Sequence, residues 1–282
     1  MVQLHDVDGG PRLSPESRGP VGSAGALLQL RGIEKHFGSV RALNNISLDV
    51  PEGQVTALVG DNGAGKSTLI KAISGISEPD GGEMIWEGKP VKVRTPKDAA
   101  SLGIATVYQD LALCDNLDIV ANMFLGREPR TGFLLDERTM EKGAKKALAD
   151  LSVVTVRSLR QSVGSLSGGQ RQAVAVAKAV MWNARLVIMD EPTAALGVTQ
   201  TKVVIDLIKA LADRGVAVIV VSHNLNDVFA VADRIAVLYL GSIVSEGAAS
   251  GYDAQRVVEL ITTGSLNGFG SVSEPSNGGV TA

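Results

Sequence analysis

Apolar residues occur along the chain in short runs that alternate with segments of helical spacing. Residues 54–59, 186–189 and 216–221 are runs dominated by Val, Leu, Ile and Ala. Short apolar runs of this kind indicate strands that are buried on both faces, as in a parallel sheet. Residues 69–74 and 199–211 follow two of these runs and have the pattern of helices. Strands that alternate with helices predict an α/β fold with a central, mostly parallel sheet.

Turn and capping residues delimit the other predicted elements. Residues 51–53, 77–82 and 87–90 are rich in Pro, Gly and Asp, which end strands. Thr95 followed by Pro96 predicts the beginning of a helix. The remaining predicted strands are 28–31, 33–37, 46–50, 83–86, 104–108, 235–240 and 243–245, and the remaining helices are 225–231 and 253–262.

The middle of the chain departs from the strand and helix alternation. Residues 136–180 are mostly at helical spacing, with Asp136 as a candidate N-cap and a glycine-bearing break at 164–169. The apolar positions at this spacing are Met140, Ala144, Leu148 and Leu151. Because a block of helices interrupts the alternation, we expect residues 110–183 to form a separate helical lobe.

Composition changes at both ends of the chain. Residues 1–26 and the end of the chain after the last helix are rich in Gly, Pro and Ser, which predicts disordered tails at 1–26 and 264–282. Residues 27–263 are then one ordered domain. A hydrophobic content of 45% is sufficient for a sizeable core.

A glycine-rich loop lies between the first apolar run and the helix that follows it. Its residues are Gly60, Asp61, Asn62, Gly63, Ala64, Gly65, Lys66, Ser67 and Thr68. This is the pattern G-x-x-x-x-G-K-[ST] between a strand and a helix, where a phosphate-binding loop must lie. Inward-pointing amides and the helix N-terminus attract phosphate, Lys66 can reach the β- and γ-phosphates, and Ser67 can offer an oxygen to Mg²⁺. The alternative, a glycine-rich turn with an incidental lysine, is disfavoured by the flanking elements.

Two adjacent carboxylates follow the second apolar run. Asp190 and Glu191 come directly after residues 186–189. Neighbouring carboxylates repel each other and are costly to bury without a cation. We expect Asp190 to bind Mg²⁺ and Glu191 to act as the general base for an attacking water. A solvent-exposed acidic turn is the alternative interpretation.

Three further residues at the ends of predicted strands are weaker candidates when each is taken alone. Gln109 could contact Mg²⁺ and the attacking water, and His223 could hold a γ-phosphate and the water. Phe37 could offer a flat face to a nucleobase. A glutamine is common at a strand end, a histidine there is more often a capping or core residue, and a phenylalanine is more often part of the core.

Composition narrows the classes of function. The 282 residues include 27 basic and 30 acidic side chains, so no basic field indicates nucleic-acid binding. The single cysteine, Cys114, cannot form an internal disulfide, which is in keeping with a reducing cytoplasm. No run approaches the roughly 18 apolar residues of a membrane-spanning helix, and Asp6 and Asp8 interrupt any signal-peptide pattern. We expect a soluble protein that can still dock on a membrane partner.

One more motif, in combination with those above, identifies a family resemblance. Residues 166–170 have the sequence Leu-Ser-Gly-Gly-Gln. Together with the phosphate loop, Gln109, the Asp190–Glu191 pair and His223, this motif resembles the nucleotide-binding subunit of ABC transporters over about residues 27–263. The resemblance implies a P-loop NTPase fold with an N-terminal antiparallel β subdomain and a helical lobe that carries the signature motif.

The family resemblance also implies roles for individual residues. It implies that Phe37 stacks on adenine, that Gln109 senses the membrane subunit, and that Glu191 and His223 are the catalytic base and the switch histidine. The signature residues Ser167, Gly168, Gly169 and Gln170 would face the ATP of an opposite subunit, so that two subunits enclose two ATP molecules in a homodimer. ATP and Mg²⁺ are the implied cofactors.

Flanking segments narrow the resemblance to the ATPases of simple-sugar importers. These segments are residues 37–43, 109–113, 116–117, 122–126 and 192–197. The resemblance implies an ATPase at the cytoplasmic face of the membrane, bound to an integral permease and indirectly served by a periplasmic or lipid-anchored sugar-binding protein. The single ATPase domain resembles the fructose- or ribose-type branch.

Two alternatives stay open, and one residue departs from the family pattern. The ATPase motifs do not identify the transported substrate, so an amino acid, a lipid or a drug is an alternative to a sugar. A non-transport ABC protein that acts on DNA or ribosomes is a further alternative, which the 101 positions from Lys66 to Ser167 disfavour because they leave no room for a long coiled-coil arm. Gly197 stands where many family members have Asp, so no role in communication across a dimer is carried over to it.

Overall fold

The computed structural model describes residues 25–151, 153, 156 and 158–265. The predicted tails at 1–26 and 264–282 therefore lie almost entirely outside the described residues. In the described part of the chain, no helix combines the length and the apolar character needed to cross a bilayer.

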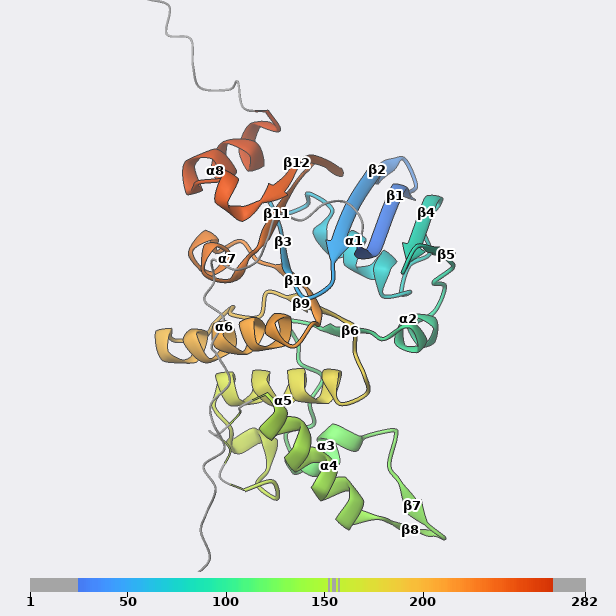
Figure 1. Ribbon diagram of the computed structural model, residues 1–282, viewed down its shortest axis with the longest axis vertical. Helices are drawn as coiled ribbons and strands as arrows, with labels where there is room; N and C mark the ends of the chain where they lie inside the picture. Colours follow the sequence, from blue (N-terminus) through green and yellow to red (C-terminus); the bar gives the residue numbers. More distant parts are fainter. Residues whose placement is uncertain (1–24, 152, 154–155, 157, 266–282) are drawn as a thin grey trace, which may run out of the picture.

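A six-stranded sheet forms the centre of the molecule (Figure 1). Its strand order is β12-β11-β3-β10-β9-β6, in which the strands from β11 to β6 are parallel and β12 is antiparallel to β11. The bounds are Val55–Gly60 for β3, Ile104–Val107 for β6, Leu186–Asp190 for β9, Ala217–Val221 for β10, Arg234–Tyr239 for β11 and Ser242–Ala248 for β12. The sheet confirms the predicted α/β fold with a mostly parallel core.

A second, antiparallel sheet of four strands is built from the N-terminal part of the chain. Its order is β2-β1-β4-β5, with bounds Val40–Pro51, Ala26–Phe37, Gly81–Trp86 and Lys89–Val91. The helix α1 (Lys66–Ile73) buries Leu69, Ile70 and Ile73 in a core that it shares with residues of both sheets. The helix that follows the glycine-rich loop is thereby fixed between the two sheets.

Helices of the mid-chain form a lobe at the end of the molecule opposite the C-terminal helix α8 (Figure 1). The elements of this lobe are α3 (Ile119–Phe124), the hairpin β7 (Arg130–Thr131) and β8 (Leu134–Leu135), α4 (Glu137–Asp150) and α5 (Gly168–Val180). The other helices are α2 (Pro96–Leu102), α6 (Val198–Asp213), α7 (Leu225–Val231) and α8 (Ala254–Thr263), with short 3₁₀ turns at Val163–Ser165 and Ala249–Gly251.

The helical prediction for residues 136–180 is wrong in its middle. The helix α4 ends at Asp150 and α5 begins at Gly168, so the break is longer than the predicted 164–169. The sequence between them contains several β-branched valines and serines, which lose side-chain freedom in a helix or compete for its backbone hydrogen bonds. The hairpin β7–β8 was not predicted because strands of two residues are too short to show alternation.

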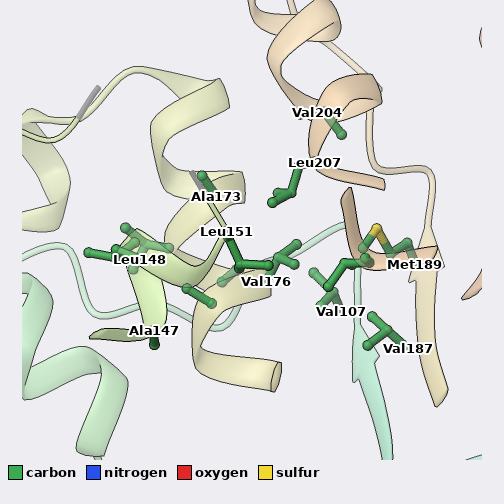
Figure 2. Close-up of a cluster of buried hydrophobic side chains, with 14 of the residues drawn as sticks. Val107, Ala147, Leu148, Leu151, Ala173, Val176, Val187, Met189, Val204 and Leu207 are labelled. Carbon is green, nitrogen blue, oxygen red and sulfur yellow. The ribbon is translucent and has the colours of Figure 1, made fainter. Parts of the chain in front are cut away.

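One hydrophobic cluster joins the central sheet to the helical lobe (Figure 2). The sheet contributes Val107, Val187 and Met189, while α5 contributes Ala173 and Val176. Leu148 and Leu151 on the α4 side and Val204 and Leu207 of α6 also belong to the part of the cluster drawn there. Because α5 is packed in this cluster, its first residues are held in a fixed position relative to the sheet.

Asn122 secures the segment that leads from the sheet into the helical lobe. Its side chain is fully buried. The Asn122 Oδ1 accepts the amide of Cys114 at 2.7 Å, and its Nδ2 donates to the carbonyls of Cys114 at 2.9 Å, Asp118 at 3.0 Å and Leu117 at 3.3 Å. A buried polar group is tolerated when its hydrogen bonds are made, and this one also satisfies its neighbours' backbone groups.

We expect Asn122→Ala to lower the free energy of unfolding by about 2–4 kcal/mol, because it removes the acceptor of the Cys114 amide, takes one of two hydrogen bonds from each of the three carbonyls and leaves a cavity in a buried place. Urea titration followed by tryptophan fluorescence measures this change. The matched control is Asn226→Ala on the exposed side of α7, which should change stability by less than about 0.5 kcal/mol. Equal midpoints for the two variants would contradict the assigned role of Asn122.

Candidate functional site

The glycine-rich loop connects the last residue of β3 to the first turn of α1. Gly63 and Gly65 have φ angles of +82° and +108°, which L side chains rarely adopt. A Cβ on Gly65 would lie 2.7 Å from the carbonyl oxygen of Ala42, and one on Gly60 would lie 2.4 Å from that of Leu238. Glycine is therefore required at Gly60 and Gly65 by the close approach of β2 and β11, as well as by the turn itself.

Lys66 is the first residue of α1 and is held across the start of the loop. Its Nζ donates to the carbonyls of Gly60 at 2.7 Å and of Asp61 at 2.9 Å. Burial lowers the pKa of Lys66, while the charges of Glu191, Asp61 and Asp190 act in the opposite direction. The ammonium group is thus partly desolvated and surrounded by acidic groups, so an anion that entered the loop would meet a cation already in position.

Asp190 ends the parallel strand β9, and β10 lies between this strand and β3, which leads into the glycine-rich loop. Val221 of β10 pairs with Asp190 on one side and with Leu58 of β3 on the other. Burial, and then the charge of Glu191, raise the pKa of Asp190, and Lys66 and Lys71 oppose this shift. A cation bound beside Asp190 would remove this penalty.

Glu191 occupies an unusual backbone conformation. Its φ is +49°, which a non-glycine residue rarely adopts. Its amide donates to the carbonyl of Val221 at 2.9 Å, and its carbonyl accepts the amide of Ala194 at 3.1 Å. The conformation turns the chain away from the strand directly after Asp190, so the two carboxylates do not continue in the same extended strand.

Glu191 and His223 interact across the ends of β9 and β10. The Nδ1 of His223 lies 2.8 Å from the Oε1 of Glu191. The Glu191 side chain is 17% exposed, whereas that of His223 is 72% exposed. A shielded carboxylate bonded to an exposed imidazole can accept a proton from a water while the imidazole contacts a second group.

A hollow of about 490 Å³ brings many of the predicted site residues together. The predicted residues that line it are Asn62, Gly63, Gly65, Lys66, Ser67, Thr68, Gln109, Asp190 and Glu191. The carbonyls of Gly60 and Asp61 accept hydrogen bonds from Lys66, which lines the hollow, and Ala64 is buried within the loop. His223 contacts Glu191, which also lines the hollow. Predicted residues from four separate parts of the sequence, 60–68, 109, 190–191 and 223, therefore form one site.

The structure does not place Phe37 or the signature residues in the lining of this hollow. Phe37, at the end of β1, is 53% exposed, with the Lys35 Nζ 5.8 Å from its ring centroid. Ser167 is the N-cap of α5 and forms a capping box with Gln170. Gly168 instead borders a different hollow of about 370 Å³ that Gln109 and Glu191 also line.

Sequence reasoning missed a wall of the main hollow. Its residues are Val40, Arg41, Ala42, Leu240 and Gly241. Val40 pairs with Phe37 across the turn between β1 and β2, so a turn predicted at Gly38 would have placed residues 40–42 beside Phe37. Nothing in the sequence indicated that Leu240 and Gly241, at the β11–β12 turn, lie in this wall. They are held beside the loop by a hydrogen bond from the Gly241 amide to the Ala64 carbonyl, a contact between residues far apart in the sequence.

The oxygen donors beside the loop suit a small hard cation that also binds phosphate. Within the described residues, no three or more His, Cys, Asp or Glu side chains cluster as a metal site. The hollow instead offers the hydroxyl of Ser67, the amide of Gln109 and the carboxylate of Asp190. Such a set resembles the sparse protein coordination of Mg²⁺, which takes its remaining ligands from phosphate and water.

Comparison with known proteins gives a consistent result. The family model described as "ABC transporter" matches residues 43–194. The chain is 45% identical to the xylose/arabinose import ATP-binding protein XylG of Sulfolobus acidocaldarius, over 85% of this chain and 95% of the relative. It is 49% identical to the fructose import ATP-binding protein FrcA of Rhizobium meliloti, over 76% and 85%.

Longer relatives and solved structures extend this result. The chain is 40% identical to the ribose import ATP-binding protein RbsA of Corynebacterium glutamicum over 89% of its length, but spans only 48% of that relative. A solved ATP-binding cassette of an ABC transporter in its ADP conformation has a TM-score of 0.71 and 26% identity. The match covers 84% of this chain and 95% of the chain in that structure. A dimeric bacterial ABC transporter cassette has a TM-score of 0.66 and 26% identity, over 80% and 100%.

We expect Asp190→Asn to stabilise the nucleotide-free protein. Because the pKa of Asp190 is raised in the folded state, its ionisation opposes folding above that pKa, and the penalty disappears as the pH falls towards the ordinary value of 3.8. The urea midpoint of the variant should therefore exceed that of the wild type at pH 7, and the difference should shrink in acid. Asp206→Asn, at an exposed position of α6, is the matched control and should show no such pH-dependent gain.

Proposed function

We propose that this chain is the ATP-hydrolysing subunit of an importer for a simple sugar. The chain belongs to the ABC transporter family, from which this proposal proceeds. The ATPase part of the proposal is carried by one observation: the hollow that joins the glycine-rich loop to Gln109, Asp190 and Glu191. The cargo part is supported by the names of the relatives, which are import ATP-binding proteins for xylose and arabinose, fructose and ribose.

The loop from Gly60 to Thr68 is assigned to the triphosphate of ATP. The amides around Gly63 and Gly65, the N-terminus of α1 and the Lys66 ammonium group together form an anion cradle. The exposed ring of Phe37, across the turn from the start of β2, whose residues 40–42 line the hollow, is assigned to stacking on the adenine. Binding at this site therefore uses backbone groups for the phosphates and one aromatic face for the base.

Ser67, Gln109 and Asp190 are the residues that would hold Mg²⁺ together with the phosphates. Their hydroxyl, amide and carboxylate oxygens fit that ion, and the raised pKa of Asp190 indicates a carboxylate that lacks a sufficient counter-charge. When bound, the ion would neutralise charge on the phosphates. Gln109 would also link the nucleotide to the segment that follows it.

Glu191 is assigned as the general base and His223 as the residue that orients the reacting groups. The 2.8 Å contact between them holds the Glu191 carboxylate at the edge of the hollow, where it can take a proton from an attacking water. The exposed imidazole of His223 has its second nitrogen available for the γ-phosphate. Hydrolysis then needs one carboxylate to move a proton and one cation, Lys66, to hold the phosphate oxygens.

A homodimer is proposed to complete the site. Ser167 is exposed at the start of α5, and the signature residues do not line the phosphate-loop hollow of their own chain. The N-terminus of α5, a helix of 13 residues, is a second place suited to an anion. The proposal that it faces the ATP of a second copy is supported by the dimeric state named for one similar solved cassette.

The partner permease is assigned to a groove between the central sheet and the helical lobe. This groove, of about 340 Å³, is lined by residues of β6, by Tyr108, Asp110 and Leu111, and by Trp182 after α5. Gln109 lies between these residues and lines the ATP hollow, so one short segment touches both sites. The subunit would thus lie peripherally on the cytoplasmic face of the membrane, and a periplasmic or lipid-anchored sugar-binding protein would act on the other side of the permease.

Glu191→Gln should lower the turnover of ATP by at least about 100-fold, because the amide cannot accept the proton. Nucleotide affinity should remain within about threefold of the wild type, since Lys66 and the loop are unchanged. Light scattering with ATP and Mg²⁺ should show a dimer of the variant. Glu83→Gln, an exposed Glu→Gln change on β4, is the matched control for turnover. Unchanged turnover, or a variant that stays monomeric beside its permease, would contradict the scheme.

Deletion of the gene in its host should abolish uptake of at least one labelled simple sugar among xylose, arabinose, fructose and ribose. Wild-type protein should restore the uptake, and the Glu191→Gln variant should not, because transport depends on hydrolysis. Uptake of labelled amino acids is the control and should be unaffected. If amino-acid uptake is lost instead and sugar uptake persists, the cargo assignment is refuted although the ATPase assignment can still hold.

A further inference from the structure

A second link joins the two loops that carry Glu191 and His223. Thr193, two residues after Glu191, donates its hydroxyl to the Oδ2 of Asp227 at 2.6 Å. Asn224, the residue after His223, donates its Nδ2 to the same oxygen at 3.0 Å. A single carboxylate oxygen of α7 therefore receives one donor from each of the two loops.

Each of these donors is itself fixed. The Thr193 side chain is among the buried polar groups of the described chain. Asn224 is the N-cap of α7: its Oδ1 accepts the amide of Asn226 at 3.1 Å, and its own amide donates to the hydroxyl of Ser222 at 3.1 Å. The link is therefore part of a connected set of hydrogen bonds behind the Glu191–His223 contact.

The backbone at Glu191 requires such support. A φ of +49° at a residue with a side chain is unfavourable by itself, and a neighbouring residue of the same loop, Ala195, has φ +59°. The bonds from the Glu191 amide to Val221 and from the Ala194 amide to Glu191 hold the backbone of the turn. The Thr193–Asp227 bond adds a side-chain tie to the part of the chain that follows His223.

We propose that Asp227 and Thr193 are positioning residues for hydrolysis: they keep the Glu191 carboxylate and the His223 imidazole in reacting geometry. This inference rests on the proposed function of Glu191. Neither residue lines the phosphate-loop hollow, so they act through Glu191 and His223 and not on the nucleotide. Asp suits the role because one charged oxygen accepts both donors, and charge-assisted hydrogen bonds are the stronger ones.

The test compares single-turnover ATP hydrolysis in Asp227→Ala, Thr193→Val and the double variant. Each single change should lower the hydrolysis rate about tenfold or more, since a small misplacement of a reacting group is costly. The double variant should fall no further than either single variant, because both changes break the same link. Thr193→Ser keeps the hydroxyl and should restore most of the lost rate. ATP affinity and the melting temperature should stay close to those of the wild type.

A second comparison separates positioning from general damage to the fold. In a Glu191→Gln background, Asp227→Ala should cause a further loss well below tenfold, since only the His223 imidazole of the two groups that it positions is still present. A further tenfold loss in that background, a parallel fall in ATP affinity and melting temperature, or an unchanged rate in the Asp227→Ala single variant would overturn the proposal. If Glu191→Gln itself retained full activity, the proposed function of Glu191 would fail instead, which is a distinguishable result.

Discussion

The site depends on electrostatic balance at one edge of the central sheet. Two adjacent carboxylates, Asp190 and Glu191, lie close enough to Lys66 to influence its pKa, and burial disfavours the charged form of both Lys66 and Asp190. Like charges in a partly buried place are unfavourable without a counter-charge, and Lys66 and Lys71 oppose the rise in the pKa of Asp190 without cancelling it. This arrangement is suited to a ligand that brings both negative and positive charge, as a metal-bound nucleotide does. The raised pKa of Asp190 is a cost in the free protein that ligand binding would offset.

Parallel pairing makes this balance possible. The strands β3, β9 and β10 run in the same direction, so the loop after β3, the carboxylates at the end of β9 and the histidine after β10 all lie at the carboxyl ends of these strands. The loops that follow β9 and β10 are joined by side-chain contacts. These are the 2.8 Å Glu191–His223 contact at the surface and the bonds from Thr193 and Asn224 to Asp227 behind it. The cluster around Val176 fixes the start of α5 relative to this edge from the other side.

Much of the site was predictable because its motifs are local. The glycine-rich loop combines its glycines, lysine and helix start within nine consecutive residues, and Asp190 directly ends an apolar run, so short-range patterns were enough. What failed depends on long-range packing. The wall from the β11–β12 turn is joined to the loop through Gly241, and the link from Thr193 to Asp227 spans 34 positions. The end of α4 at Asp150, ahead of the predicted break at 164–169, was missed because the helical spacing of a few apolar residues was given more weight than the β-branched residues that follow.

Gly197 is a glycine that the packing of the described chain does not require. It is the N-cap of α6, with a φ of −74° that any residue can adopt, and no side chain caps the helix there. A Cβ at this position would meet nothing within 4 Å, so neither backbone nor space requires glycine. Asp at an N-cap would stabilise the helix by about 1 kcal/mol relative to a non-capping residue, although glycine itself loses only a few tenths. The packing of one subunit therefore does not account for the absence of a carboxylate, whereas at Gly60 and Gly65 it fully accounts for the absence of a side chain.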